Sequence, residues 1–211
     1  MGCSGQAVIS AHAGLILFID GSVALDGKPF IPRPGRWSEV PENSTLQTQS
    51  GKADLLLAPG VFLRLGTNTG IRLLSNKLFD VQVDLLSGSA IVESLTVQHD
   101  NSIRFFHNRQ QIRIDRAGHY RIDSEPAQVA VQSGQLEILR EDAVLTVAEH
   151  QSFSIDSGTV HELSVLPPDS LEAWDQQRQL LDNPTPPLAK QLEGWRRRLA
   201  KLWAVSRDSS Y

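Results

Sequence analysis

The sequence is poor in cysteine, methionine and aromatic residues. One cysteine (Cys3) and one methionine occur in 211 residues, and aromatic residues make up 6% of the chain. A single cysteine excludes an internal disulfide and any zinc site that needs two or more cysteines. Neither sign of charge dominates, since 20 Lys+Arg stand against 24 Asp+Glu, so the charge predicts no binding to nucleic acid. No run approaches about 18 consecutive apolar residues, and therefore no transmembrane helix is predicted.

What the chain does contain is an ordinary globular composition. Hydrophobic residues make up 40% and charged residues 21% of the chain, which argues against wholesale disorder. A domain of this length buries roughly 70% of the surface that its unfolded chain exposes, so it needs no metal or disulfide for stability. These properties predict one domain with an appendage, and no cofactor is expected.

Short segments with a hydrophobic period of two fill most of the chain. About a dozen of them are divided by Gly, Pro, Asn and Asp, which predicts an all-β body. Asp20-Gly21 and Asp26-Gly27 each stand between short apolar runs, a pattern typical of a hairpin turn. The alternating segments are 53–57, 61–65, 71–73, 81–85, 90–92, 112–114, 120–122, 129–131, 136–138, 144–147 and 153–155.

One strand–turn–strand unit recurs along this region. Two alternating apolar residues lead into Ser-Gly at Gly88 and at Gly134, and two more follow in both copies. A looser copy surrounds Gly51. The repetition predicts stacked antiparallel hairpins that bury a shared face, as in a β-roll or solenoid. A β-sandwich stays open as the alternative.

The pattern changes to helix near residue 166. Asp169 and Glu172 have the spacing of a capping box, which predicts a helix over 170–181. A proline-rich hinge at 183–187 separates it from a second predicted helix over 188–206. The predicted organisation is a flexible N-terminus over 1–6, a β domain over 7–165 and a helical extension over 166–211.

The second predicted helix is amphipathic, with an apolar stripe facing a basic side. Its stripe is expected to pack on the β body, to dock a partner or another copy of the chain, or to lie on an anionic membrane. Packing or partner docking is favoured over peripheral membrane contact. The predicted partner-binding residues are Trp195, Leu199, Leu202, Arg196, Arg197 and Arg198.

The β region over about 7–156 resembles the FecR domain of bacterial envelope regulators. Small-residue patterns over 21–27, 46–57, 59–65 and 83–92 carry the resemblance, and the helix with Trp174 and Arg178 resembles the one that follows such domains in soil bacteria. The resemblance implies an extracytoplasmic domain that senses or binds and does not catalyse. The anti-sigma segment and membrane helix of the best-known members are not found in this sequence, so only the domain and its setting are expected to transfer.

The N-terminal residues bear on that setting. Gly2-Cys3 is followed by small polar residues, as at the maturation site of a bacterial lipoprotein. Lipidation of Cys3 requires an apolar signal upstream, so it is expected only if a longer precursor is trimmed. In that case the protein is expected to be periplasmic or associated with the envelope. The alternative is a stray cysteine near a frayed terminus.

The sequence contains no recognisable catalytic motif and no metal-ligand pattern. The histidine spacings, for example His99 to His107, match no common ligand pattern and predict residues on turns and solvent faces. No Gly-x-Ser-x-Gly sequence or phosphate-binding loop occurs. Carboxylates such as Asp54 are assigned to solubility or turns, while His119 is expected either to line a pocket or to lie exposed on a strand.

The leading hypothesis is therefore a non-enzymatic, FecR-like domain that senses through a protein partner or a cell-wall glycan. One alternative is an enzyme that processes carbohydrates or small molecules on a β-roll, with His119 as its candidate residue. Another is a structural, self-assembling repeat protein. The oligomeric state is left open.

Overall fold

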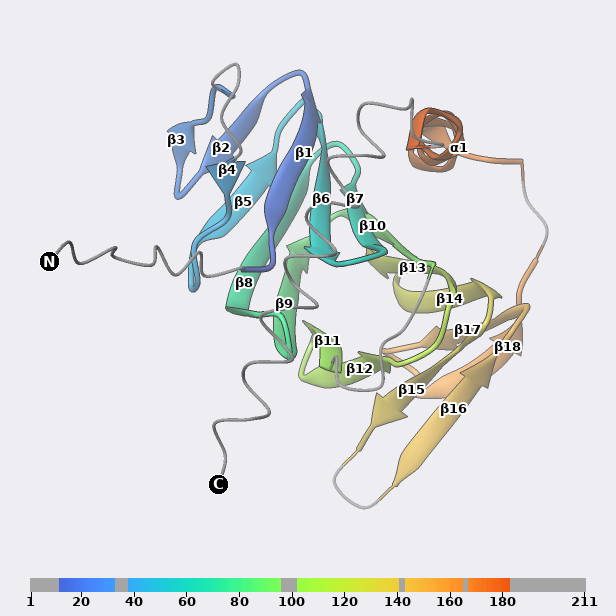
Figure 1. Ribbon diagram of the computed structural model, residues 1–211. Helices are drawn as coiled ribbons and strands as arrows, with labels where there is room; N and C mark the ends of the chain where they lie inside the picture. Colours follow the sequence, from blue (N-terminus) through green and yellow to red (C-terminus); the bar gives the residue numbers. More distant parts are fainter. Residues whose placement is uncertain (1–11, 33–37, 96–101, 141–142, 165–166, 183–211) are drawn as a thin grey trace, which may run out of the picture.

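The computed structural model describes residues 12–32, 38–95, 102–140, 143–164 and 167–182, and its body is all β, as predicted. Two unclosed nine-stranded sheets pack face to face (Figure 1). In spatial order, sheet 1 contains β4 (Ser38–Glu39), β1 (Leu15–Asp20), β6 (Lys52–Ala58), β7 (Val61–Leu65), β10 (Ser89–Ser94), β13 (Gly118–Ser124), β14 (Ala127–Ser133), β17 (Gln151–Ser154) and β18 (Thr159–Glu162).

Sheet 2 has the same number of strands. In spatial order it contains β3 (Lys28–Pro29), β2 (Val23–Leu25), β5 (Thr45–Thr48), β8 (Thr69–Lys77), β9 (Asp80–Ser87), β11 (Ser102–His107), β12 (Gln110–Ile114), β15 (Gln135–Leu139) and β16 (Val144–Ala148). From β6 onward the chain alternates between the two sheets. The β6–β7 hairpin of sheet 1, for example, is followed by the β8–β9 hairpin of sheet 2 across the core. Neighbouring strands are antiparallel except β9 and β11, which pair in parallel because β10 crosses to sheet 1 between them.

Glycines mark the corners where the chain passes from one sheet to the other. Gly88 joins β9 to β10 and Gly134 joins β14 to β15, with φ of 81° and 86°. A Cβ at Gly88 would lie 2.6 Å from the Cα of Thr69, so the corner also needs the close approach that only glycine allows. The prediction that these Ser-Gly units close hairpins is therefore wrong. They are the corners of a sandwich-like body.

The two Asp-Gly sequences have different roles, since one closes a hairpin and the other links the two sheets. Asp26 and Gly27 have φ of 49° and 74° and close the β2–β3 hairpin, in which Leu25 pairs with Lys28. That prediction is confirmed. Asp20-Gly21 instead carries the chain from β1 in sheet 1 to β2 in sheet 2, so the hairpin predicted there is wrong.

The main core lies between the sheets. Inward residues of sheet 1, such as Leu63 and Ile122, meet inward residues of sheet 2, such as Val83 and Ile112, and all four are at most 1% exposed. Burying each such side chain contributes roughly 1.5–3 kcal/mol. The period-two alternation of the sequence is thus explained by one face of each strand pointing into this core.

Helix α1 (Ser170–Asp182) confirms the first helix prediction and its cap. The Asp169 carboxylate accepts hydrogen bonds from the backbone N–H groups of Leu171 and Glu172, both at 2.9 Å. The Glu172 carboxylate accepts one from the N–H of Asp169 at 3.2 Å, which completes the capping box. Within the part of the chain that the structure describes, α1 is the single helix, and it is not long and apolar enough to cross a membrane. The second predicted helix, over 188–206, lies outside the described residues.

Candidate functional site beneath helix α1

Helix α1 lies on the outer face of sheet 1, on the side away from the main core (Figure 1). Its apolar residues Leu171 and Trp174 are 3% and 8% exposed and pack on Ile91 of β10, which is completely buried. The ammonium of Lys52 lies 5.6 Å from the centre of the Trp174 ring and donates to the carbonyl of Ser170 at 2.8 Å. This apolar contact is small, so most of the interface with the sheet is polar.

A group of ionisable residues, buried or partly buried, makes up that polar part, and we call it the Arg64 cluster. It contains Asp54, Arg64, Glu93, His119, Asp175 and Arg178. Strand register brings the sheet members together, because Asp54 of β6 lies opposite Arg64 of β7, and Glu93 of β10 lies opposite His119 of β13. Their side chains point outward by strand alternation, and α1 then covers them.

Arg64 is at the centre of the cluster and is completely buried. Its Nη1 lies 2.7 Å from Oε2 of Glu93 and 2.5 Å from Oδ1 of Asp175, while Nε lies 3.8 Å from Oδ1 of Asp54. Burial acts to lower the pKa of Arg64, but the three carboxylates outweigh it, so the pKa of this guanidinium is raised. Arg64 is therefore a permanent buried cation that orients acids from three different elements.

Two side chains of α1 enter the cluster. Asp175 contacts both Arg64 and Nε2 of His119, the latter at 2.8 Å. Arg178 donates from Nε to Oδ2 of Asp54 at 3.0 Å, and its guanidinium lies 4.6 Å from the centre of the Phe18 ring. The helix is thus attached to β1, β6, β7 and β13 by charge, besides its apolar contact with β10.

A second group of ion pairs holds the N-terminus of α1. In Arg121 of β13, Nη2 lies 2.6 Å from Oδ2 of Asp169 and Nη1 lies 3.1 Å from Oε1 of Glu172. Its Nε lies 2.9 Å from Oδ1 of Asp123. Burial acts to lower the pKa of Arg121, and the hydrogen bond to Asp169 and the charge of Asp123 raise it overall. Burial acts to raise the pKa of Asp169, but Arg121 and the capped N–H groups lower it overall.

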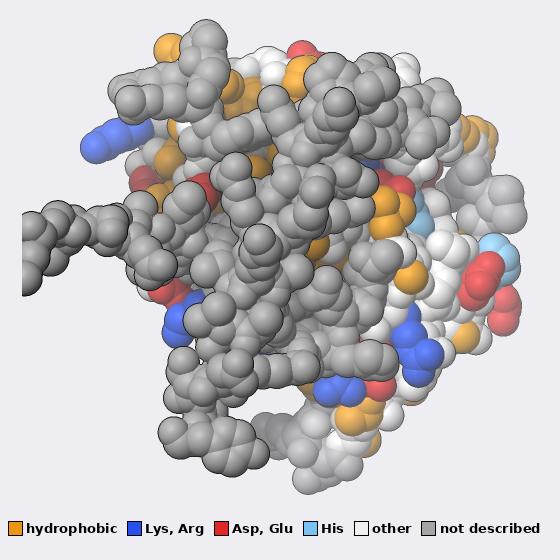
Figure 2. All heavy atoms as spheres, in the orientation of Figure 1, with side chains coloured by type: hydrophobic (Ala, Val, Ile, Leu, Met, Phe, Trp, Pro, Cys, Tyr) orange, Lys and Arg blue, Asp and Glu red, His pale blue; other side chains and the backbone are white. Residues whose placement is uncertain are grey.

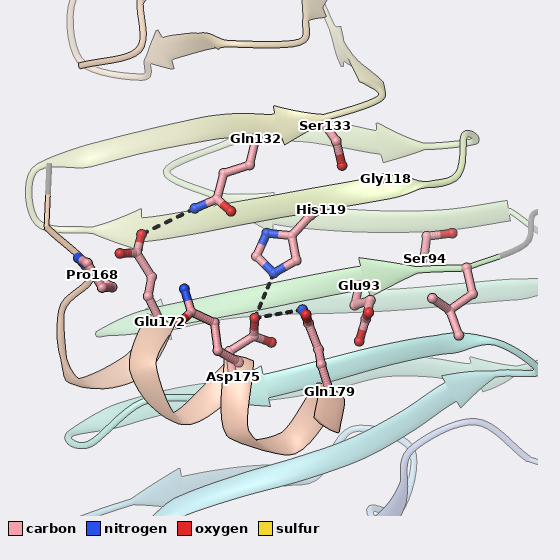
Figure 3. A pocket seen from close by; sticks show the side chains of 12 residues that line it. Glu93, Ser94, Gly118, His119, Gln132, Ser133, Pro168, Glu172, Asp175 and Gln179 are labelled. Atoms are coloured by element: carbon pink, nitrogen blue, oxygen red, sulfur yellow. Dashed lines mark hydrogen bonds and ion pairs between the residues drawn. The ribbon is translucent and has the colours of Figure 1, made fainter. Parts of the chain in front are cut away.

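A pocket of about 670 Å³ opens between α1 and strands β10, β13 and β14 (Figure 3). Its lining comprises Glu93, Ser94 and Leu95 at β10, Gly118 and His119 of β13, Gln132 and Ser133 of β14, Pro168 before α1, and Glu172, Asp175, Gln176 and Gln179 of α1. Gln132 donates to Glu172 at 3.3 Å and Gln179 donates to Asp175 at 2.9 Å. The wall is therefore a network of carboxylates and amides, of the kind that orients a polar ligand.

His119 lines this pocket from β13, and its side chain is 15% exposed. Its Nε2 contacts Asp175, while its Nδ1 is buried and makes no hydrogen bond among the described residues. Ser94 alternates with Glu93 along β10 and lies opposite Val61, so its hydroxyl points toward the main core and not into the pocket. His119 is thus in a pocket and not exposed on a strand, which decides between the two positions expected from the sequence.

Two residues were assigned wrongly from the sequence. Asp54, which was attributed to solubility or turns, is completely buried beneath α1. His107, which was expected on a turn or solvent face, is 5% exposed, and its Nδ1 lies 2.7 Å from the carbonyl oxygen of Leu85. The sequence signal for a buried partner such as Asp54 lay in the helix. Trp174 and Arg178 are four residues apart and so share one side of α1, and the side that packs Trp174 on the sheet also brings Arg178 to it.

The remaining predicted site residues cannot be compared with this site. Cys3, Trp195, Arg196, Arg197, Arg198, Leu199 and Leu202 all lie outside the described residues. Over the described ranges, no group of three or more His, Cys, Asp or Glu residues is arranged to hold a metal ion. Figure 2 shows one face of the molecule, where acidic, basic and hydrophobic side chains form small interspersed groups.

Comparison with known proteins gives little further guidance. No protein-family model matches the chain, and no curated protein matches it. Two crystal structures, each described as a proposed anti-sigma factor from Parabacteroides distasonis ATCC 8503, are similar at 12% and 11% sequence identity, both with a TM-score of 0.45. Each similarity covers 56% of this chain and 58% of that one. At this level, the function of those proteins does not transfer to this chain.

Proposed function

We propose that this protein is a non-catalytic binding and sensing domain of the FecR type, and that its ligand binds in the pocket beside α1. One observation carries the proposal: the pocket and the Arg64 cluster share Glu93, His119 and Asp175. A ligand that hydrogen-bonds to these side chains therefore acts on the contacts that hold α1 to sheet 1. Occupancy is coupled in this way to the position of a helix, and a sensing domain requires such coupling.

Binding is favoured over catalysis by the way in which the carboxylates are used. Glu93 and Asp175 are paired with Arg64, and Glu172 is paired with Arg121. Acid–base catalysis by two carboxyl groups needs environments that differ enough to give them opposite roles. Here all three pocket carboxylates share one role, since each is fixed by an arginine as a hydrogen-bond acceptor.

The proposed setting is the bacterial envelope, with a protein or a cell-wall glycan as the ligand. The FecR-like strand patterns and the Gly2-Cys3 sequence support it. Intact mass spectrometry of the native protein from membrane and soluble fractions tests the setting. A membrane-held form that begins at Cys3 and carries added acyl mass is expected, whereas an unmodified soluble chain beginning at Met1 would contradict lipidation.

A pair of matched substitutions tests the binding site. Gln176 and Gln177 are neighbouring, exposed residues of α1, but only Gln176 lines the pocket. Gln176→Trp is expected to fill the pocket, while Gln177→Trp adds the same ring outside it. Full-length protein is passed over purified cell-wall sacculi and over immobilised envelope protein extract. We expect Gln176→Trp to lower retention at least tenfold on one of them, and Gln177→Trp to leave it unchanged.

The coupling to α1 has its own measurement. Hydrogen exchange of the α1 amides is measured for the protein alone and for the protein bound to the material that retains it, either sacculi or envelope protein extract. A bound ligand that contacts Asp175 and Glu93 is expected to slow exchange in α1, because it adds contacts across the helix–sheet interface. Equal retention of the wild type and Gln176→Trp would refute the pocket as the binding site. Retention without any change in exchange would refute the sensing role.

A further inference from the structure

The charge of the pocket wall restricts the class of ligand. Three carboxylates line it, those of Glu93, Glu172 and Asp175, and among the described lining residues there is no lysine or arginine. An anionic ligand would meet like charges at close range and would lose its hydration without a compensating cation. Phosphates, nucleotides and acidic peptides are therefore poor matches to this wall.

A cation is not required either, because the carboxylates already have partners. Nη1 of Arg64 lies 2.7 Å from the carboxylate of Glu93 and 2.5 Å from that of Asp175. Nη1 of Arg121 lies 3.1 Å from the carboxylate of Glu172. These arginines approach from the sheet, behind the pocket wall. An ammonium group entering from the open side would compete with guanidinium groups that are already in place, so its gain in charge pairing is small. The wall is matched best by an uncharged ligand.

The hydrogen-bonding atoms narrow the class further. The amides of Gln132, Gln176 and Gln179 offer both donors and acceptors, and the three carboxylates offer acceptors. A hydroxyl group is itself both donor and acceptor. A ligand with many hydroxyls can therefore satisfy this mixed set from a range of orientations.

The size and the few apolar residues agree with the same class. A volume of about 670 Å³ falls within the range of roughly 300–1,000 Å³ for small-molecule sites. Leu95 and Pro168 are the apolar side chains of the described lining, which is too few for a lipid or a hydrophobic peptide. They are enough for the C–H face of a sugar ring.

We infer that the pocket binds an uncharged saccharide, which makes the ligand a glycan and not a protein. This inference rests on the proposed function, since it names the ligand class of the same site. The carboxylates and glutamines orient the hydroxyls, and the arginines behind the wall hold the carboxylates in place.

Calorimetric titration of the full chain tests the ligand class. The uncharged probes are triacetylchitotriose, cellotriose and maltotriose. The charged controls are chitotriose, which is a deacetylated cation, and trigalacturonate, which is an anion. We expect at least one uncharged probe to bind, and both charged controls to bind at least tenfold more weakly. Gln176→Trp is expected to abolish binding, and Gln177→Trp to leave it unchanged.

The outcomes distinguish the ligand class from the proposed function. If no uncharged saccharide binds, or if a charged control binds as tightly, the saccharide inference is overturned. Should Gln176→Trp still lower retention on envelope protein extract in that case, the pocket is a binding site for a protein and the proposed function stands. If Gln176→Trp has no effect on retention or titration, both proposals fail.

Discussion

The outer faces of the two sheets carry the same kind of ion pair and differ in what covers them. On sheet 1, α1 lies over Arg64 and Asp54, whose side chains are completely buried. On sheet 2, Arg104 pairs with Asp80 and Arg113 pairs with Glu137, and the two arginine side chains are 29% and 39% exposed. Each face places arginines and carboxylates on the outward side of neighbouring strands. Among the described residues, the helix makes the difference.

The residue types of an ion pair therefore do not determine by themselves how much the pair contributes to the stability of the fold. Exposed pairs contribute about 0–1 kcal/mol, because water and salt screen them. Breaking a buried pair by removing one partner costs about 3–5 kcal/mol, since it leaves an uncompensated charge away from water. The same cross-strand pattern is therefore a solubility feature on sheet 2 and the attachment of a helix on sheet 1.

The largest expected effect compares one arginine from each face. Arg64→Met leaves Asp54, Glu93 and Asp175 without their shared cation, and should lower the free energy of unfolding by about 3–5 kcal/mol. Arg113→Met removes a half-exposed arginine and should cost less than about 1 kcal/mol. Urea denaturation of both variants measures the difference. Equal losses of unfolding free energy would show that burial beneath α1 does not increase the contribution of the Arg64 cluster to stability.

The apolar contact of α1 gives the next largest effect. Leu171→Ala removes a side chain that is 3% exposed and packs on Ile91, at an expected cost of about 2 kcal/mol. Leu86→Ala makes the same change on β9, where the side chain is 41% exposed, and should stay within about 0.5 kcal/mol. Hydrogen exchange should show faster exchange in α1 for Leu171→Ala and not for Leu86→Ala. Unchanged exchange in both would contradict the packing role.

The smallest effect concerns pH and the cap of α1. The pKa of Asp169 lies below its ordinary value of 3.8, chiefly because the hydrogen bond from Arg121 and the capped N–H groups outweigh the effect of burial. The folded state thus binds this proton less tightly than the unfolded state. The stabilisation is present above the unfolded pKa and is lost as pH falls through the lower folded pKa.

Asp169→Asn isolates this charge, because asparagine also caps helices well. The wild type should be more stable than Asp169→Asn at neutral pH, and the difference should shrink below about pH 5 and vanish below the folded pKa. Urea midpoints of both proteins between pH 7 and pH 3 provide the comparison. A difference that is constant over this range would assign the effect to something other than the charge of Asp169.

Much of the local structure could be predicted from the sequence. The all-β body follows from period-two alternation, the β2–β3 hairpin from Asp26-Gly27, and the start of α1 from Asp169 and Glu172. Each of these depends on residues that are close together in the chain. The Ser-Gly corners at Gly88 and Gly134 show the limit of such signals. A turn with positive φ looks the same in sequence whether the next strand pairs beside the last or crosses the core.

The candidate site could be predicted only in fragments. His119 was open between a pocket and an exposed strand, and Trp174 and Arg178 were seen to share a helix. Nothing local connects Asp54 with Arg178, which are 124 residues apart, or Arg64 with Asp175, which are 111 apart. Outward strand positions normally face water, so alternation assigned Asp54 to the solvent.

The sequence by itself determined the strands, their inward faces, the positions of the glycine turns and the capped helix, because these depend on backbone conformation and on side-chain periods of two and 3.6 residues. Whether a glycine turn closes a hairpin or passes to the other sheet was not among them. Only the tertiary structure decided which outward face is covered. Docking of α1 removed Arg64 and Asp54 from water, turned ordinary surface charges into a buried cluster and left a polar pocket at its edge. The physical reason is that the energy of a charge depends on its surroundings, and the surroundings are made by residues distant in the chain.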